Sequence, residues 1–268
     1  MLGVSSHLVL FERRGAVAWL TLNRPEVRNA LTPEMREELI EAVGTVASDP
    51  ELRCLVLTGA GDGFCTGADI GGTASRQGQP RAAGSVRDTI RGGVQRLFRA
   101  LWELEKPTVA AVNGVAAGFG CHLAFACDLL IAADSARFVE VFARRGIVPD
   151  GGGAYILPRL VGLARAKELV FLADSWTAED AERIGLVNKV VPAGELEKAT
   201  TEWAERLAAG PTKALGLAKR LLNRSLESDL ATSLEEEALA QELIVGTNDI
   251  KEGMRAFAER RDPNFTGT

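Results

Sequence analysis

Cysteine and histidine are both scarce in this chain of 268 residues. Four cysteines (Cys54, Cys65, Cys121 and Cys127) form no C-x-x-C pair, and two histidines (His7 and His122) have no metal-ligand spacing. The sequence therefore predicts no metal site. We interpret Cys121 and Cys127 as small apolar core residues.

An excess of basic residues is also absent, and the net charge is −5. Non-specific nucleic-acid binding needs a basic face, so nucleic acid is not an expected partner. Residues 1–10 lack a basic region followed by a long apolar core, so we predict no secretory signal and expect a cytoplasmic protein. Three motifs are missing as well: Gly59 and Gly61 are not followed by the third glycine of a dinucleotide fingerprint, and there is no GxxxxGK or GxSxG motif.

One long apolar stretch, Val109 to Ala133, imitates a membrane helix, because only His122 and Asp128 in it are ionisable. A spanning helix needs about 20 mostly apolar residues without interruption. This stretch is interrupted by Asn113-Gly114 and again by two further glycines. We therefore predict a buried strand–loop–helix–strand unit and no membrane association.

Strand and helix patterns alternate along the first part of the chain, which predicts an α/β core with crossovers between strands. The expected elements are a hairpin of residues 9–13 and 16–22, a helix that begins at Thr32-Pro33, strands at 54–58, 108–112 and 129–133, and a helix at 86–104 that ends before Lys106-Pro107. With 46% hydrophobic residues the composition is that of an ordinary globular domain.

Helical patterns dominate after Pro158. Helices are predicted at 164–173, 178–184, 196–209, 211–224, 230–247 and 250–260, and a strand only at 186–191. We place a domain boundary near residue 200, between an α/β core of residues 1–200 and a helical region of residues 201–268.

Two segments rich in small residues follow predicted strands and are candidate ligand-binding sites. Gly114 to Leu123 has three glycines and two alanines, and a helix beginning near Gly118 would point unpaired N–H groups at a bound anion. Phe64 to Ile70 is a second loop of the same kind, after strand 54–58. Two strand-end loops that each offer a backbone N–H are what an oxyanion hole requires.

These two segments resemble the crotonase family, also called the enoyl-CoA hydratase/isomerase superfamily. Four further segments extend the resemblance in order along the chain: Leu22 to Pro25 with Asn29 to Leu31, Gly146 to Gly152, Ala178 to Ala181 with Gly185 to Asn188, and Phe257 to Arg261 with Pro263 and Phe265. The resemblance implies an α/β spiral of ββα units, followed by a helical C-terminal trimerisation region. It also implies a homotrimer, or a homohexamer of paired trimers, in fatty-acid metabolism.

The resemblance further implies an acyl-CoA thioester substrate, whose coenzyme A is part of the substrate, and no permanently bound cofactor. Its carbonyl oxygen would lie between the backbone N–H groups of Ala68 and Phe119. The second position is usually glycine, and the phenylalanine side chain restricts φ and occupies space there. The residues expected beside coenzyme A are Arg24, Arg28, Ala30, Thr66, Ala68, Asp69 and Ile70, although the two arginines could equally be solvated and Asp69 could brace its loop.

At the acid–base positions the sequence departs from the hydratases of the family. Their two glutamates correspond to His122 and Phe142 here. A carboxylate stands instead at Asp150, where isomerases and dehalogenases of the family often have a functional aspartate. Asp150 could also be a helix N-cap. His122 is either a second acid–base group or a packed core residue, and Glu140 is expected to serve at the surface or structurally, unless a bulge turns it to the hydratase position.

The favoured prediction is an enoyl-CoA isomerase that moves a carbon–carbon double bond, with Asp150 as the proton carrier and His122 as a second candidate. The alternatives are hydration of a 2-enoyl-CoA, with Asp150 or Glu140 holding the water, and an acyl-CoA-binding protein with little catalysis. Residues 71–84 are expected to form a mobile loop, either a substrate lid or a surface insertion.

Overall fold

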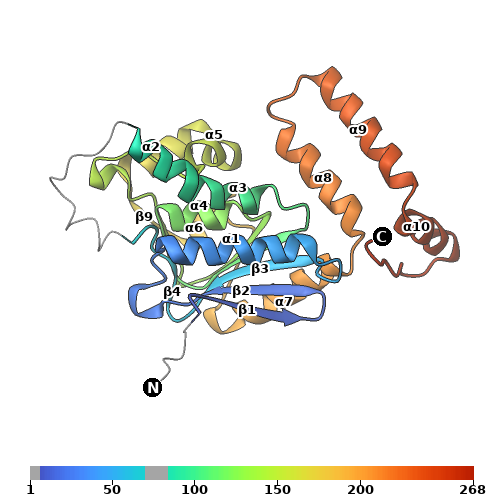
Figure 1. The fold of residues 1–268 in the computed structure, drawn as a ribbon, viewed down its shortest axis with the longest axis horizontal. Coiled ribbons are helices and arrows are strands. Elements are labelled where there is room, and N and C mark those ends of the chain that lie inside the picture. The colour runs from blue at the N-terminus through green and yellow to red at the C-terminus, as the bar shows by residue number, and fades with distance from the viewer. Residues whose placement is uncertain (1–6, 70–83) are drawn as a thin grey trace.

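The computed structural model describes residues 7–69 and 84–268, and their strands form two sheets (Figure 1). The predicted loop at 71–84 lies, except for Gly84, outside the described residues. The larger sheet has six strands in the order β1 (Val9–Arg14), β2 (Val17–Leu22), β3 (Cys54–Gly59), β5 (Thr108–Val112), β7 (Leu129–Ala133) and β10 (Lys189–Val191). The smaller sheet has four, in the order β4 (Gly63–Cys65), β6 (Val115–Ala117), β8 (Arg137–Val139) and β9 (Ser175–Thr177).

The helices connect these strands into a spiral. They are α1 (Pro33–Ser48), α2 (Ser85–Ile90), α3 (Arg96–Trp102), α4 (Phe119–Phe125), α5 (Gly153–Leu172), α6 (Ala178–Arg183), α7 (Leu196–Ala208), α8 (Thr212–Arg224), α9 (Leu230–Val245) and α10 (Asn248–Glu259), with short helical turns η1 (Pro25–Val27), η3 (Arg91–Gln95), η4 (Ala143–Arg145) and η5 (Ala193–Glu195). In the runs β5, β6, α4 and β7, β8, α5, one strand of each sheet precedes the helix. Strands β2, β3, β5, β7 and β10 pair in parallel, as crossover connections require. This is the ββα spiral that the family resemblance implied.

The inner strands β2, β3, β5 and β7 of the larger sheet are buried on both faces because they are apolar at nearly every position, whereas the edge strand β1 is largely exposed. Leu20, Leu55 and Leu57 belong to a cluster with α1, α3 and α4, whereas Trp19 and Val56 belong to a second cluster with α7. This alternation follows the two-residue period of a strand. Each fully buried leucine stabilises the fold by about 1.5–3 kcal/mol relative to an exposed one.

Most predicted elements are confirmed. Thr32 caps α1 by accepting a hydrogen bond from the Met35 N–H, and the predicted helix at 86–104 runs through α2, the π-helical η3 and α3. The unit predicted in place of a membrane helix is β5, β6, α4 and β7. Among helices of the described residues, none is long and apolar enough to cross a membrane. All four cysteines are free and buried, and burial raises the pKa of Cys65 and of Cys127 to about 12.

Three expectations need correction. None of the four strands of the smaller sheet was predicted, and β10 begins only at Lys189. The predicted helix at 164–173 corresponds to the part of α5 that follows a non-helical break at Gly162, where φ is 74°, whereas the helical part from Gly153 to this break was not predicted. Short strands carry too little periodic pattern to be recognised.

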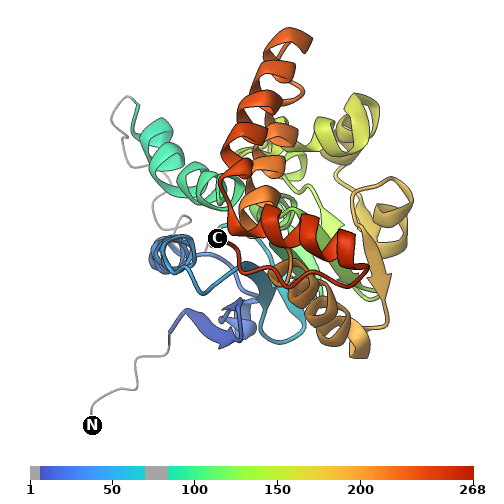
Figure 2. The same cartoon turned by 90° about the vertical axis from the view of Figure 1, so that its right-hand side faces the viewer.

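The last three helices stand apart from the sheets. Figures 1 and 2 show α8 and α9 side by side, extending away from the α/β core, with α10 beside the C-terminus. Helix α7, in contrast, packs on the larger sheet through Ala199, Ala204 and Ala208. The proposed boundary near residue 200 falls inside α7, and the division into two domains remains a proposal.

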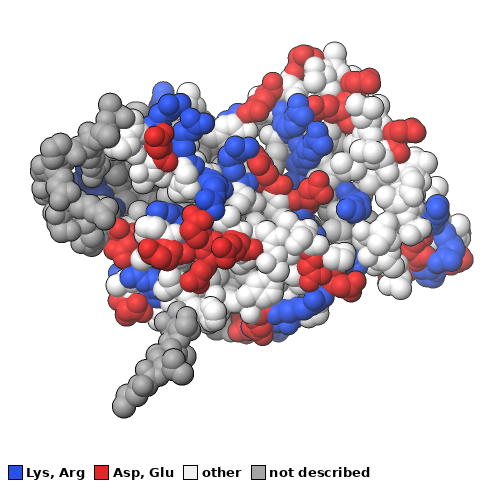
Figure 3. Space-filling view, viewed as in Figure 1, with Lys and Arg blue, Asp and Glu red and all other residues white. Residues whose placement is uncertain are grey.

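Charge is distributed unevenly over the surface. On the face shown in Figure 3, acidic side chains gather over α1, whose sequence contains four glutamates. Uncharged surface extends over the C-terminal helices on the same face. Large apolar side chains are exposed on these helices.

Candidate active site

The first predicted donor, Ala68, lies in a loop that is hydrogen-bonded to Leu31, just before α1. The Leu31 N–H donates to the Gly67 carbonyl at 2.8 Å, and the Asp69 N–H donates to the Leu31 carbonyl at 3.0 Å. These two hydrogen bonds form an isolated parallel bridge between Leu31 and Ala68. Because successive residues of an extended chain point to opposite sides, the Ala68 N–H faces away from Leu31. It donates to no other described residue, and Ala68 is exposed.

The second predicted donor, Phe119, is the first residue of α4. Gly118 precedes it with φ at 53°, and its N–H donates to the Val139 carbonyl at 2.9 Å. No side chain caps α4, and the Phe119 N–H donates to no other described residue, as is usual in the first turn of a helix.

The two donor segments lie against each other. A Cβ atom added to Gly67, where φ is 86°, would lie 2.8 Å from the Ala117 carbonyl oxygen and 3.3 Å from the Phe119 nitrogen. Only glycine accommodates both this φ and this approach. The structure thus brings together the two backbone segments that the sequence singled out.

The residues expected beside coenzyme A lie around the Ala68 loop. Arg24 donates through Nη1 to the Ala30 carbonyl at 2.6 Å and to the Asp69 carboxylate at 2.9 Å, and the Thr66 N–H donates to the Arg28 carbonyl at 3.1 Å. Arg24 therefore braces the donor loop, while Arg28 is exposed in a left-handed conformation. Contact of either arginine with a phosphate remains a prediction, and Ile70 lies outside the described residues.

His122 and Glu140 form a buried pair. The two side chains are 0% and 2% exposed, and His122 Nε2 lies 3.1 Å from Glu140 Oε2. The His122 ring stacks on Phe142 with centroids 5.2 Å apart and meets the edge of Phe119 at 6.2 Å. Among the described residues, His122 Nδ1 and Glu140 Oε1 have no hydrogen-bond partner. Glu140 is thus not a surface residue.

Asp150 precedes three glycines that pack on this aromatic group. A Cβ atom on Gly151 would overlap the Phe119 ring, one on Gly152 would lie 2.6 Å from the Phe98 ring, and one on Gly153 would overlap His122 Nε2. The N-cap of α5 is Gly152, and no side chain caps this helix. The interpretation of Asp150 as a helix cap was therefore wrong.

The surroundings of Asp150 favour its neutral form. Asp150 is partly buried, and burial raises the pKa of its carboxyl group above the ordinary value. The neighbouring His122 lowers this pKa, and the neighbouring Glu140 raises it. A carboxyl group with a raised pKa can accept and return a proton.

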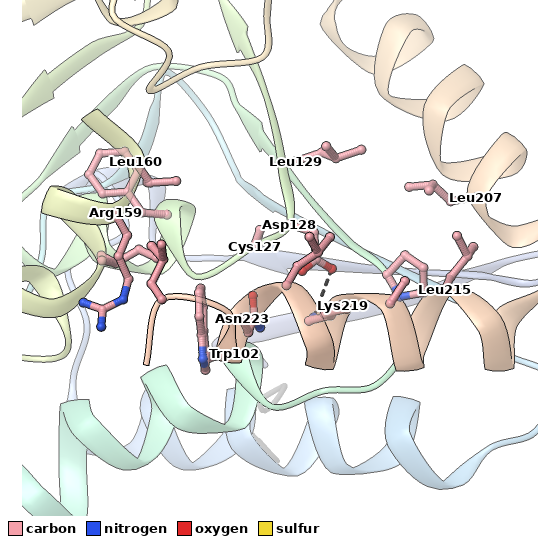
Figure 4. A pocket seen from close by; sticks show the side chains of 16 residues that line it. Trp102, Cys127, Asp128, Leu129, Arg159, Leu160, Leu207, Leu215, Lys219 and Asn223 are labelled. Carbon is pink, nitrogen blue, oxygen red and sulfur yellow. Dashed lines mark hydrogen bonds and ion pairs between the residues drawn. The ribbon is translucent and has the colours of Figure 1, made fainter. Parts of the chain in front are cut away.

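A separate pocket lies between α8 and the core. It has a volume of about 450 Å³ and includes the ion pair of Asp128 and Lys219, 3.0 Å apart (Figure 4). Its lining comes from α3, α4, α5, α7 and α8, and none of the predicted site residues belongs to it. No group of three His, Cys, Asp or Glu side chains within residues 7–69 and 84–268 could hold a metal ion.

Known proteins resemble this chain along almost its whole length. A sequence model of the family described as enoyl-CoA hydratase/isomerase matches residues 12–268. The chain belongs to this family. Among its relatives, the 1,2-epoxyphenylacetyl-CoA isomerase of Escherichia coli is 41% identical over 94% of this chain and 95% of its own length. The short-chain-enoyl-CoA hydratase of Clostridium acetobutylicum is 40% identical over 94% of this chain and 95% of its own length. The crystal structure of an enoyl-CoA hydratase from Bacillus anthracis superposes with a TM-score of 0.90 at 35% identity, covering 97% of this chain and all of that one.

Membership of the enoyl-CoA hydratase/isomerase family confirms the resemblance seen in the sequence. Substrates of this family are coenzyme A thioesters. What sequence reasoning missed is the contact between His122 and Glu140. The sequence did contain a hint of this contact: Glu140 lies only two residues before Phe142, which stands at the position of a hydratase glutamate.

Proposed function

We propose that this chain is an enoyl-CoA isomerase that moves a carbon–carbon double bond relative to the thioester. The proposal is based on the acid–base groups, because the two hydratase glutamates are absent and an aspartate is present nearby. His122 and Phe142 stand at the positions of the hydratase glutamates, and a partly buried Asp150 with a raised pKa stands on the glycine turn beside Phe119. One carboxylate is sufficient to carry a proton between two carbons.

In the proposed reaction the thioester carbonyl oxygen accepts hydrogen bonds from the Ala68 and Phe119 N–H groups. The Asp150 carboxylate removes a proton from C2 of a 3-enoyl thioester, and the electron pair of that C–H bond moves into the carbonyl to give a dienolate. Asp150, now protonated, returns the proton to C4, and the double bond forms between C2 and C3. Each preorganised donor on the developing oxyanion contributes about 10²–10³ in rate.

Hydration of a 2-enoyl-CoA is the second candidate, and the name of the Clostridium acetobutylicum relative favours it. A water molecule would then need a carboxylate to hold it. Glu140 faces His122 and is closed off from solvent, which leaves Asp150 for that task. An acyl-CoA-binding protein with little turnover is the third candidate, and the absence of both hydratase glutamates favours it.

We also propose that coenzyme A contacts the Arg24, Arg28 and Thr66 segment, and that the protein is a cytoplasmic homotrimer or homohexamer. Exposure of large apolar side chains on α8, α9 and α10 supports assembly, because closed symmetry buries such surfaces.

Separate incubation of the purified protein with a 3-enoyl-CoA and a 2-enoyl-CoA tests the proposed reaction. We expect the 3-enoyl-CoA to be converted to the 2-enoyl-CoA. Fast hydration without isomerisation would reject the isomerase, and tight acyl-CoA binding without turnover of either compound would favour the binding protein.

A further inference from the structure

The proposed reaction uses Asp150 and two backbone N–H groups, and it leaves the buried pair of His122 and Glu140 without a role. Both side chains are closed off from solvent in the described structure, yet each retains one polar atom without a partner. A buried polar atom left unpaired costs about 1–3 kcal/mol. An apolar pair of similar size would avoid that cost, so the pair calls for an explanation beyond stability.

A chain of direct contacts links Glu140 to the segment that carries Asp150. Glu140 Oε2 is bonded to His122 Nε2 at 3.1 Å, and the same Nε2 lies against Gly153 so closely that a Cβ atom there would overlap it. Gly153 is only three residues from Asp150, and its N–H donates to the Asp150 carbonyl at 3.3 Å. The position of the His122 ring therefore affects the position of the Asp150 turn.

The other restraints on the His122 ring are apolar. Phe142 stacks on it at an interplanar angle of 11°, and Phe119 meets it edge-on at 89°. Aromatic contacts restrict the plane of a ring but leave open which of its nitrogen atoms faces which way. Among the described residues, the bond to Glu140 is the only hydrogen bond of the imidazole nitrogens, so it alone fixes the ring nitrogen that faces Gly153.

We propose that Glu140 is a positioning residue for proton transfer by Asp150: its carboxylate fixes the His122 ring, and this ring supports the glycine turn from which Asp150 reaches the substrate. The inference rests on the proposed function, because it assigns Glu140 to the reaction at that site. The same two side chains also lie near enough to act on the carboxyl group, since His122 and Glu140 are the titratable groups that influence the pKa of Asp150 within the described residues.

Kinetics of four variants test this role: Glu140→Gln, His122→Asn, the double variant, and Glu37→Gln as the control. Glutamine keeps the size of the side chain but replaces the carboxylate, so the hydrogen bond that fixes the His122 ring loses its ionised acceptor and is weakened. Glu37 is an exposed carboxylate that pairs with Arg96. Turnover of both enoyl-CoA compounds, the KM for each, and the melting temperature are measured for every variant.

We expect Glu140→Gln to lower kcat by about 10- to 100-fold with KM changed by less than about twofold, because a misplaced group loses rate more than binding. Since Glu140 acts through His122, the double variant should be no slower than His122→Asn, apart from a factor of about two. Glu37→Gln should match the wild type. If Glu140→Gln does not fold, Glu140→Asp takes its place in the same comparison.

Two outcomes would overturn the role of Glu140: an unchanged kcat in Glu140→Gln, or losses that multiply in the double variant. A wild type that hydrates but does not isomerise would reject the isomerase alone, and the same four variants would then decide the role of Glu140 from the hydration rate. A wild type that turns over neither compound would overturn both proposals.

Discussion

Asp150 combines two properties that acid–base catalysis near neutral pH requires. Its backbone is placed by Gly151 and Gly153, which lie directly on the rings of Phe119 and His122. Its carboxyl group is partly buried, and burial raises its pKa. A catalytic carboxyl group works best when its pKa approaches the working pH.

Replacement of Asp150 by asparagine should abolish turnover without weakening the fold. Isomerisation is expected to fall by about 10²–10⁴-fold, the usual contribution of an acid–base group, while a non-reactive acyl-CoA still binds. The melting temperature at neutral pH should be unchanged or higher, because a carboxyl group whose pKa is raised in the folded state destabilises that state when it is ionised. Asp174→Asn, which changes an exposed aspartate, serves as the control.

The pH dependence of the wild type follows from the same shift. Asp150 must be ionised to accept a proton, so kcat should fall as the pH drops through a pKa that lies above the ordinary aspartate value of about 3.9. The stability contribution has the opposite sign, since protonation of Asp150 favours the folded state. A variant Asp150→Asn that isomerises at the wild-type rate would show that another group carries the proton.

At the residue level the proposed backbone donors and Asp150 follow from motif position, and their roles stay predictions. The partners of His122 were not predictable. Its contact with Glu140 joins α4 to the segment after β8, and only the packing of those elements decides which way the two side chains turn. For the same reason the sequence left open whether Glu140 serves at the surface or structurally, and its burial excludes the surface.

Among the elements, the glycine turn before α5 has a tight packing requirement. Gly151 and Gly152 have φ of 54° and 91°, a region that side chains disfavour, whereas Gly153 has an ordinary φ. Its requirement for glycine comes from the close approach to His122 alone.

Gly153→Ala should therefore disturb the site through contact and not through backbone strain. The added methyl group would overlap His122 Nε2, and we expect a loss of about 1–3 kcal/mol in the free energy of unfolding, as for other overpacked sites. Turnover per folded molecule should also fall. The control is Gly44→Ala in α1, which has open space at its Cβ and should be neutral or stabilising by about 0.5–1 kcal/mol. Chemical denaturation of both variants measures the difference, and equal stabilities would contradict the close approach.

The sequence predicted well those elements that have a periodic apolar pattern over many residues or a clear capping residue. Helix α1 shows both, with Thr32 as its cap and Met35, Leu39, Val43 and Val46 on its buried face. Strand β9 has only three residues and pairs antiparallel to β8 at the edge of the smaller sheet, so no local pattern marks it. Its existence depends on the neighbouring strand and not on its own sequence.

For the whole molecule, the C-terminal helices expose more apolar surface than a stable monomer normally leaves in water. The exposed fraction is 75% for Leu230, 55% for Leu234 and 84% for Phe257. Figure 3 shows uncharged surface over this part of the chain. A trimer or hexamer would cover such residues by symmetry.

Light scattering at micromolar concentration should give the mass of a trimer or hexamer of the 28.6 kDa chain. Leu234→Glu places a charge among the exposed apolar side chains of α9 and should lower that mass, whereas the neighbouring Glu235→Gln should leave it unchanged. A monomer mass for the wild type would reject assembly through these helices.

The overall fold was predictable because the family resemblance extends through the whole chain, from Leu22 to Phe265. Composition and periodicity alone indicated only an α/β core and a helical end. The two-sheet spiral depends on long-range parallel pairing between strands such as β3 and β5, and no local pattern specifies such pairing.

The central claim, that the chain isomerises enoyl-CoA through Asp150, is tested most directly by the first product formed from a 3-enoyl-CoA. Initial rates for the 2-enoyl-CoA and for any 3-hydroxyacyl-CoA are measured in one reaction with the wild type and in another with Asp150→Asn. We predict that the wild type forms the 2-enoyl-CoA first, and that Asp150→Asn forms it at least about 10²-fold more slowly. Hydration of added 2-enoyl-CoA with no conversion of the 3-enoyl-CoA would contradict the account.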